Sequence, residues 1–160
     1  MEKVYLVYPG LGKTYAAKCN KNILDVRLSH FQNLNTANLS EEYLEKIKGQ
    51  PMEMKLNPDF PQNLIDFVKN GLAQDKIVVM ALKQTNIDFL IENNIDFDFV
   101  VPAEDKLEQL KNDYISRGNT LEVAERNINN VLKSIDDIKK YNKEIIYLHN
   151  NEYLLDLFSK

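Results

Sequence analysis

Short apolar runs alternate along the chain with longer segments in which apolar residues recur every three or four positions. The short runs are rich in Val and Ile and have the length of buried strands; they cover residues 4–8, 23–26, 77–82, 97–101 and 145–148. Helical spacing is found in residues 13–20, 40–48, 61–72, 87–93, 106–117, about 120–141 and 153–158. This alternation predicts crossover connections between strands, and therefore an α/β fold with a mostly parallel, five-stranded sheet and helices on both faces.

The chain has 160 residues, the size of one domain, and it contains no internal repeat, low-complexity tract or long linker. We therefore predict a single domain over residues 1–160. Residues 28–59 carry many polar residues and turn signals, and are interpreted as an excursion over the edge of the sheet that is suited to covering a substrate. Residues 104–130 are predicted to be mainly helical, with Gly118 between two helices, and Gly71 is expected near the end of its own helix, where the chain turns.

Composition narrows the class of protein further. Hydrophobic residues make up 44% of the chain and charged residues 28%, as in globular proteins, and no apolar run approaches the roughly 20 residues that span a bilayer. The N-terminus has no signal-peptide pattern, so a cytoplasmic protein without a membrane contact is expected. Cys19 is the single cysteine and cannot form an internal disulfide. The formal net charge of −4 argues against a broad nucleic-acid surface, although it leaves room for a local basic pocket.

Residues 4–14 read as a strand, a tight glycine turn and the start of a helix. Gly10 and Gly12 permit backbone conformations that bring N–H groups close to phosphate oxygens, and the start of a helix adds further N–H donors for an anion. Lys13 can neutralise the β- and γ-phosphates of ATP, and the hydroxyl of Thr14 is placed to ligate Mg²⁺. The residues predicted to hold the triphosphate are Pro9, Gly10, Leu11, Gly12, Lys13 and Thr14.

One position of this motif departs from the full pattern. The Walker A sequence is G-x-x-x-x-G-K-[ST], and Val7 stands where the first glycine is expected. The alternative is an ordinary turn between a strand and a helix that happens to contain Gly-Lys-Thr. The strand-to-helix context and the two remaining glycines favour the phosphate-binding interpretation.

The second predicted strand ends in further polar residues. In an open parallel sheet, side chains at the carboxyl ends of the strands face the ligand crevice, so Asp25, Arg27 and Ser29 are candidate site residues. Asp25 could hold Mg²⁺ through a water, and Arg27 could bind an anionic acceptor through its bidentate guanidinium. Against this, Asp25 could cap the turn and Arg27 could be a solvated surface charge. Ser29 is the weakest candidate of the three.

Motifs spread over most of the chain resemble those of the small P-loop nucleotide kinases of bacteriophages and related genomes, which are similar to deoxynucleoside monophosphate kinases. Residues 8–14, Tyr-Pro-Gly-Leu-Gly-Lys-Thr, resemble F-P-G-x-G-K-[ST]. Residues 60–65 resemble F-P-x-N-Y-I at a helix start, and residues 76–81 and 90–102 resemble the strands and the helix that follow. Residues 114–119, Tyr-Ile-Ser-Arg-Gly-Asn, resemble aromatic-x-x-R-G-N. Only the first motif is specific alone, and the order and spacing together carry the resemblance.

The resemblance implies a three-layer P-loop kinase-like fold with a helical lid, and an enzyme that transfers the γ-phosphoryl group of ATP to a nucleoside monophosphate or a related acceptor, with Mg²⁺. Lys13, Asp25 and Arg117 would be its catalytic residues, with Arg117 in the lid. The alternative for Arg117 is a surface pair with Asp113, four residues earlier. Residues 28–59 would cover the acceptor.

Two departures from the family pattern keep other functions open. Arg27 stands where the family often has a second acid, and Asp113 stands where it tends to have a second lid arginine; Arg126 is the candidate replacement for that arginine. A catalytically weak or inactive nucleotide-binding protein on the same scaffold, and a polynucleotide 5′-hydroxyl kinase, are therefore the alternatives. The identity of the acceptor and the oligomeric state are not fixed by the sequence, which is compatible with a homodimer.

Overall fold

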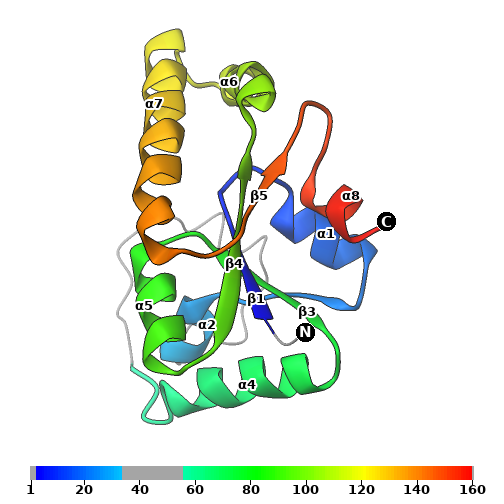
Figure 1. Cartoon of the computed structure of the whole chain (residues 1–160), viewed down its shortest axis with the longest axis vertical. Helices are drawn as coiled ribbons and strands as arrows, with labels where there is room; N and C mark the ends of the chain where they lie inside the picture. Colours follow the sequence, from blue (N-terminus) through cyan, green and yellow to red (C-terminus); the bar gives the residue numbers. More distant parts are fainter. Residues whose placement is uncertain (1–2, 34–55, 160) are drawn as a thin grey trace.

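The computed structural model describes residues 3–33 and 56–159, and the helix predicted over residues 40–48 lies outside these ranges. Its centre is a five-stranded sheet in the order β2-β3-β1-β4-β5, in which every neighbouring pair is parallel (Figure 1). The strands are β1 (Lys3–Val7), β2 (Ile23–Asp25), β3 (Ile77–Ala81), β4 (Asp96–Pro102) and β5 (Ile145–Leu148). The α/β prediction is thus confirmed, and the sheet is wholly rather than mostly parallel.

Helices cover both faces of this sheet and make three layers, an arrangement consistent with a P-loop-like fold. The helices are α1 (Lys13–Cys19), α2 (Leu28–Gln32), α4 (Gln62–Ala73), α5 (Gln84–Glu92), α6 (Leu107–Ser116), α7 (Leu121–Ile138) and α8 (Leu154–Phe158), with single turns of 3-10 helix at Glu104–Lys106 and Lys139–Tyr141. The core on one face takes residues from α4, α5 and the end of α7, and the core on the other takes residues from α1, α6 and α8. No helix in the described part of the chain is long and apolar enough to cross a membrane.

Alternation of side chains along β1 explains why both faces are covered. Val4 and Leu6 are buried in one core, whereas Val7 is buried in the other. Because successive side chains of a strand point to opposite faces, a strand with apolar residues at nearly every position requires helices on both sides. β1 lies between β3 and β4, so the loop that follows it leaves the middle of the sheet at its carboxyl edge. Ligand crevices of open parallel sheets form at this edge.

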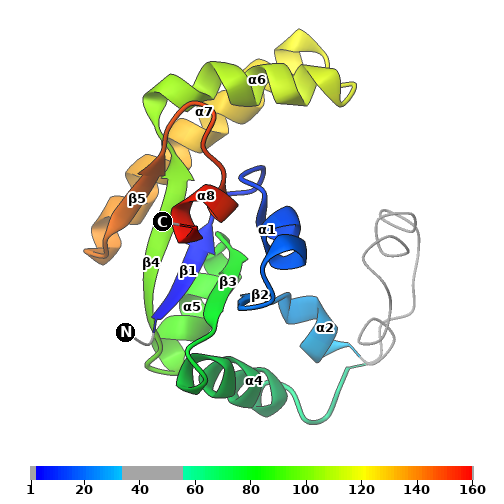
Figure 2. The same cartoon turned by 90° about the vertical axis from the view of Figure 1, so that its right-hand side faces the viewer.

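The helices α6 and α7 pack against each other at the end of the sheet toward which β1 and β4 point (Figure 2). Gly118 lies between them with a φ of 98°, and the side chain of Thr120 caps α7 by accepting a hydrogen bond from Val123 N at 3.2 Å. The two predicted helices on either side of Gly118 are therefore present. They bring the end of α6, at Arg117, near the loop that follows β1.

Of the excursion predicted over residues 28–59, the structure describes residues 28–33 and 56–59, and the short helix α2 lies in the first of these ranges. Gly71 lies near the end of its helix, as predicted, because α4 ends at Ala73 and Gly71 O accepts hydrogen bonds from Gln74 N at 3.2 Å and Lys76 N at 3.0 Å. A Cβ atom at Gly71 would lie 2.9 Å from Leu24 Cδ1, so the close approach of α4 to β2 is what requires a glycine there.

Candidate functional site

The turn between β1 and α1, residues 9–14, is called the glycine loop. Gly10 and Gly12 have φ angles of 94° and 86°, a region that side chains other than glycine rarely adopt. Leu11 anchors the loop because its side chain is fully buried in the core and its carbonyl accepts a hydrogen bond from Leu154 N at 2.9 Å. The loop is therefore held open, with its remaining residues facing a cavity rather than the protein core.

Lys13 and Thr14 of the glycine loop meet the end of β2. Lys13 Nζ lies 3.7 Å from Asp25 Oδ1, and the side chains of the pair are 17% and 9% exposed. Thr14 Oγ1 donates to Asp25 Oδ2 at 3.5 Å and accepts from Arg27 Nη2, also at 3.5 Å. Four residues predicted as candidates from two separate segments are thus in one cluster of charges and hydroxyls.

The carboxylate of Asp25 offers oxygen atoms that fit a magnesium ion. Asp25 Oδ1 is buried and has no hydrogen-bond partner among the described residues, since Lys13 Nζ lies beyond hydrogen-bond distance. A buried acceptor oxygen without a partner is costly unless a ligand or an ion satisfies it. Carboxylate and hydroxyl oxygens are the ligands that Mg²⁺ prefers, and this ion keeps several waters, so it needs few protein ligands. Asp25 and Thr14 therefore form a donor set that suits Mg²⁺.

A cavity beside the glycine loop has a volume of about 680 Å³. Its lining comes from the glycine loop, from Arg117 at the end of α6, and from Tyr153, Leu155 and Asp156 around the start of α8. We call it cavity 1. Its volume lies in the range of cavities that hold small-molecule ligands.

The second cavity, cavity 2, has a volume of about 460 Å³ and lies at the carboxyl ends of β2 and β3. Its lining includes Arg27 and Ser29, together with Lys83 and Asn86 from the segment after β3. Asn86 is only 5% exposed; its Nδ2 donates to Ala81 O at 2.7 Å, and its Oδ1 has no hydrogen-bond partner in the described part of the chain. Lys83 and Asn86 were not predicted, because no motif marks them.

Lys13 and Pro9 line both cavities. Lys13 therefore lies at the boundary between the two spaces, with its ammonium group 3.7 Å from the carboxylate of Asp25. This is the strongest geometric feature of the site.

The two arginines predicted after β4 have different positions. Arg117 lines cavity 1, and no ion pair joins it to Asp113 within the residues that the structure describes. Instead, Asp113 Oδ2 accepts a hydrogen bond from Tyr153 Oη at 3.4 Å. Arg126 is exposed on α7 and is not among the described residues that line cavity 1 or cavity 2. The structure thus brings Arg117 to the site but not Arg126.

Burial also changes the acid–base behaviour of two tyrosines near the glycine loop. It raises the pKa of both Tyr114 and Tyr153, and the carboxylate of Asp113 raises both further. Both side chains are therefore neutral at physiological pH and can donate hydrogen bonds. Tyr153 was not predicted as a site residue, although it lines cavity 1.

No protein-family model matches the chain, and none of the curated proteins matches it. By its fold and site, the protein belongs to the class of three-layer α/β proteins with an open glycine loop at the carboxyl edge of a parallel sheet.

Proposed function

We propose that the protein is an ATP-dependent phosphotransferase that acts on a nucleoside monophosphate or a similar acceptor. The observation that carries the proposal is the position of Lys13 between two cavities. Phosphoryl transfer requires a donor and an acceptor on either side of the transferred group, with a cation at the group itself. Two cavities that share one lysine meet this requirement.

On the donor side, the glycine loop and cavity 1 would bind ATP. Gly10 and Gly12 leave space for phosphate oxygens to approach backbone N–H groups, and Lys13 supplies the positive charge. The nucleoside would lie between Arg117 and Tyr153, which both line cavity 1. An aromatic ring and a guanidinium are both favourable neighbours for a base.

On the acceptor side, Arg27 and Lys83 would bind the phosphate of the acceptor in cavity 2. Both residues line this cavity, and their charges suit a phosphate dianion. Asn86 offers a carbonyl oxygen that an N–H or O–H group of the acceptor would satisfy. Arg27, which stands where the family often has an acid, thus has a use in binding an anion.

The remaining residues would neutralise charge and exclude water. Mg²⁺, held by Thr14 and by Asp25 directly or through a water, would neutralise part of the phosphate charge. Arg117 is on the helix that approaches the glycine loop, so a small movement of α6 toward the loop would bring its guanidinium to the transferring phosphoryl group and close cavity 1 to water. A cytoplasmic location, where ATP is abundant, is part of the proposal.

The direct test uses ATP labelled in its γ-phosphate with a panel of nucleoside monophosphates, nucleosides and 5′-hydroxyl oligonucleotides. The expected product is a labelled nucleoside diphosphate that forms only when Mg²⁺ is present. Absence of a labelled product with every acceptor, at protein concentrations where ATP binds, would contradict the proposal.

A catalytically weak nucleotide-binding protein is the second candidate. Val7 favours it, because this residue is fully buried in the sheet where the full motif has a glycine. This candidate predicts that ATP raises the melting temperature without turnover, and that Lys13→Ala abolishes the rise. Product formation in the labelled-ATP assay distinguishes the two candidates.

A further inference from the structure

The most deeply buried charged side chain in the described part of the protein is Lys106, which is 0% exposed. It is the last residue of the short 3-10 helix Glu104–Lys106, which leads into α6. A buried ammonium group is costly unless other groups stabilise it. Lys106 is absent from the described lining of both cavities, so a direct contact with a ligand does not explain its burial.

The described residues give the ammonium of Lys106 a hydrogen bond and an aromatic contact. It donates a hydrogen bond to Gln109 Oε1 at 2.9 Å, and it lies 3.9 Å from the centre of the Tyr153 ring. A desolvated cation close to an aromatic ring is strongly attracted to it. Burial lowers the pKa of Lys106, while the carboxylates of Asp113 and Glu152 raise it.

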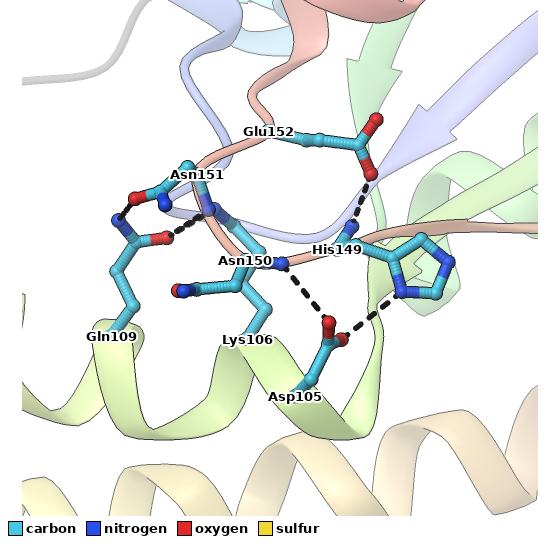
Figure 3. Close-up of polar contacts among 7 residues, drawn as sticks. All are labelled: Asp105, Lys106, Gln109, His149, Asn150, Asn151 and Glu152. Carbon is cyan, nitrogen blue, oxygen red and sulfur yellow. Dashed lines mark hydrogen bonds and ion pairs between the residues drawn. The ribbon is translucent and has the colours of Figure 1, made fainter.

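The same short helical segment holds the chain that leads from β5 to Tyr153 (Figure 3). Gln109 exchanges two hydrogen bonds with Asn151, from Asn151 N at 3.0 Å and to Asn151 Oδ1 at 3.1 Å. Asp105 contacts His149 Nδ1 at 3.1 Å and accepts from Asn150 N at 3.4 Å. Side chains at the start of α6 therefore fix residues 149–151.

The ring of Tyr153 in turn lies against the glycine loop. A Cβ atom at Gly12 would lie 3.6 Å from Tyr153 Cβ and 3.7 Å from Tyr153 Cδ1. Leu154 N donates to Leu11 O, as described above, and Tyr153 Oη donates to Asp113 on α6. Tyr153 thus connects the start of α6, the middle of α6 and the glycine loop, while it forms a wall of cavity 1.

We propose that Lys106 is a positioning residue for the donor nucleotide: its buried ammonium holds the Tyr153 ring in place as the wall against which the nucleobase stacks. Lys106 acts through this ring and does not contact the nucleotide. A ring that is fixed before binding loses less conformational freedom on binding, which raises affinity for the base. The inference rests on the proposed binding of ATP in cavity 1.

The proposal separates recognition of the base from recognition of the phosphates. Inorganic tripolyphosphate carries the phosphates alone and would use the glycine loop without a base to stack on the Tyr153 ring. ATP would use both. A variant that frees the Tyr153 ring should therefore weaken binding of ATP but not of tripolyphosphate.

The test measures binding of ATP and of inorganic tripolyphosphate to the full chain by isothermal titration calorimetry. Lys106→Met removes the ammonium and leaves an apolar side chain one atom shorter, and Gln109 Oε1 retains its hydrogen bond from Asn151 N. We expect Lys106→Met to weaken the affinity for ATP by about two- to thirtyfold and to leave the affinity for tripolyphosphate unchanged. The matched control is Lys111→Met, at a lysine of α6 whose ammonium pairs with Glu108 at 3.9 Å; it should change the affinity for neither ligand.

A second variant shows whether Lys106 acts through Tyr153. Tyr153→Leu removes the ring and should weaken the affinity for ATP by about five- to hundredfold. Adding Lys106→Met to this variant should cause no further loss of affinity. Normal affinity for ATP in either single variant, equal loss of affinity for both ligands, or additive losses in the double variant would overturn the proposal. Normal affinity for ATP in Tyr153→Leu overturns it whether or not Lys106→Met folds. If wild type binds neither ligand, or binds ATP no more tightly than tripolyphosphate, the proposed function itself fails.

Discussion

The ammonium of Lys13 lies 3.7 Å from Oδ1 of Asp25, and this ion pair joins the glycine loop to the end of β2. Both side chains are largely buried, so each charge depends on the other in the absence of a ligand. The pair keeps Lys13 at the boundary of the two cavities, where the proposed reaction needs it.

We expect Lys13→Met and Asp25→Asn to be destabilising singly and less so together. Removing one partner leaves a poorly solvated charge, which costs about 1–3 kcal/mol, whereas the double variant leaves none. Urea denaturation of wild type, the two single variants and the double variant gives the coupling free energy. Additive losses would show that the two groups do not interact in solution. ATP should raise the melting temperature of Asp25→Asn less than that of wild type. It should not raise the melting temperature of Lys13→Met or of the double variant.

Arg117 should be important for turnover, whereas Arg126 should not. Replacing Arg117, which lines cavity 1, by Met should lower kcat by about 10²- to 10³-fold with a smaller effect on the KM for ATP, because its charge is proposed to act mainly in the transition state. Arg126→Met removes the same charge from an exposed position on the next helix and should leave kcat within about twofold of wild type. Steady-state kinetics checks both. An equal loss in the two variants would mean that α7 reaches the site during turnover.

The fold was predictable because its strands are short apolar runs that alternate with segments of helical spacing. Predicted and observed strands differ at their ends by at most one residue, and β5 (Ile145–Leu148) agrees at both ends. The glycine loop and the charged residues after β2 were predictable for a related reason, since carboxyl ends of parallel strands meet at one edge. The short helix α2 has only five residues, too few for a helical period to stand out from a polar segment.

The rest of the site was not predictable because it depends on contacts between distant segments. Tyr153 and Lys106 are 47 positions apart, and only the packing of α6 beside the β5–α8 connection brings the ammonium to the ring. Lys83 and Asn86 belong to no motif, and their place in cavity 2 follows from the position of β3 next to β1. Arg126 was a candidate because it lies one helix beyond Arg117 in sequence, yet the direction of α7 keeps it out of the lining of the two cavities.

Lys83 should affect the acceptor and not the donor. It lines cavity 2 and is absent from the described lining of cavity 1, so Lys83→Met should raise the KM for the nucleoside monophosphate by about tenfold, as expected for the loss of one charge-assisted contact, and leave the KM for ATP unchanged. Initial rates with each substrate varied in turn check this. Lys76→Met is the control, because Lys76 donates to Asn22 at the opposite end of β3. A rise in the KM for ATP alone would reverse the assignment of the two cavities.

Lys106 should make the stability of the protein depend on pH in the alkaline range. Burial lowers its pKa in the folded protein below the ordinary 10.5. The nearby carboxylates raise the pKa and so oppose this shift; they belong to Asp113, Glu152, Asp156 and Asp105. Between the lowered pKa and 10.5 the unfolded chain binds more protons than the native protein, so the free energy of unfolding rises with pH across this window. Below the window the full cost of burying the charge is present.

Comparison of wild type with Lys106→Met isolates this effect, because the two proteins share all other titrating side chains. At pH 7 the variant should be as stable as wild type or more stable, since an apolar side chain of similar length replaces a buried charge. As the pH is raised toward 10.5, the difference should shift in favour of wild type. Over the same window wild type should lose ATP affinity, because a neutral amine attracts the Tyr153 ring less than an ammonium does. Urea denaturation and calorimetry at pH 7, 8, 9 and 10 would measure both changes. A stability difference that does not change with pH would show that Lys106 has an ordinary pKa and that its ammonium is solvated rather than held against the ring.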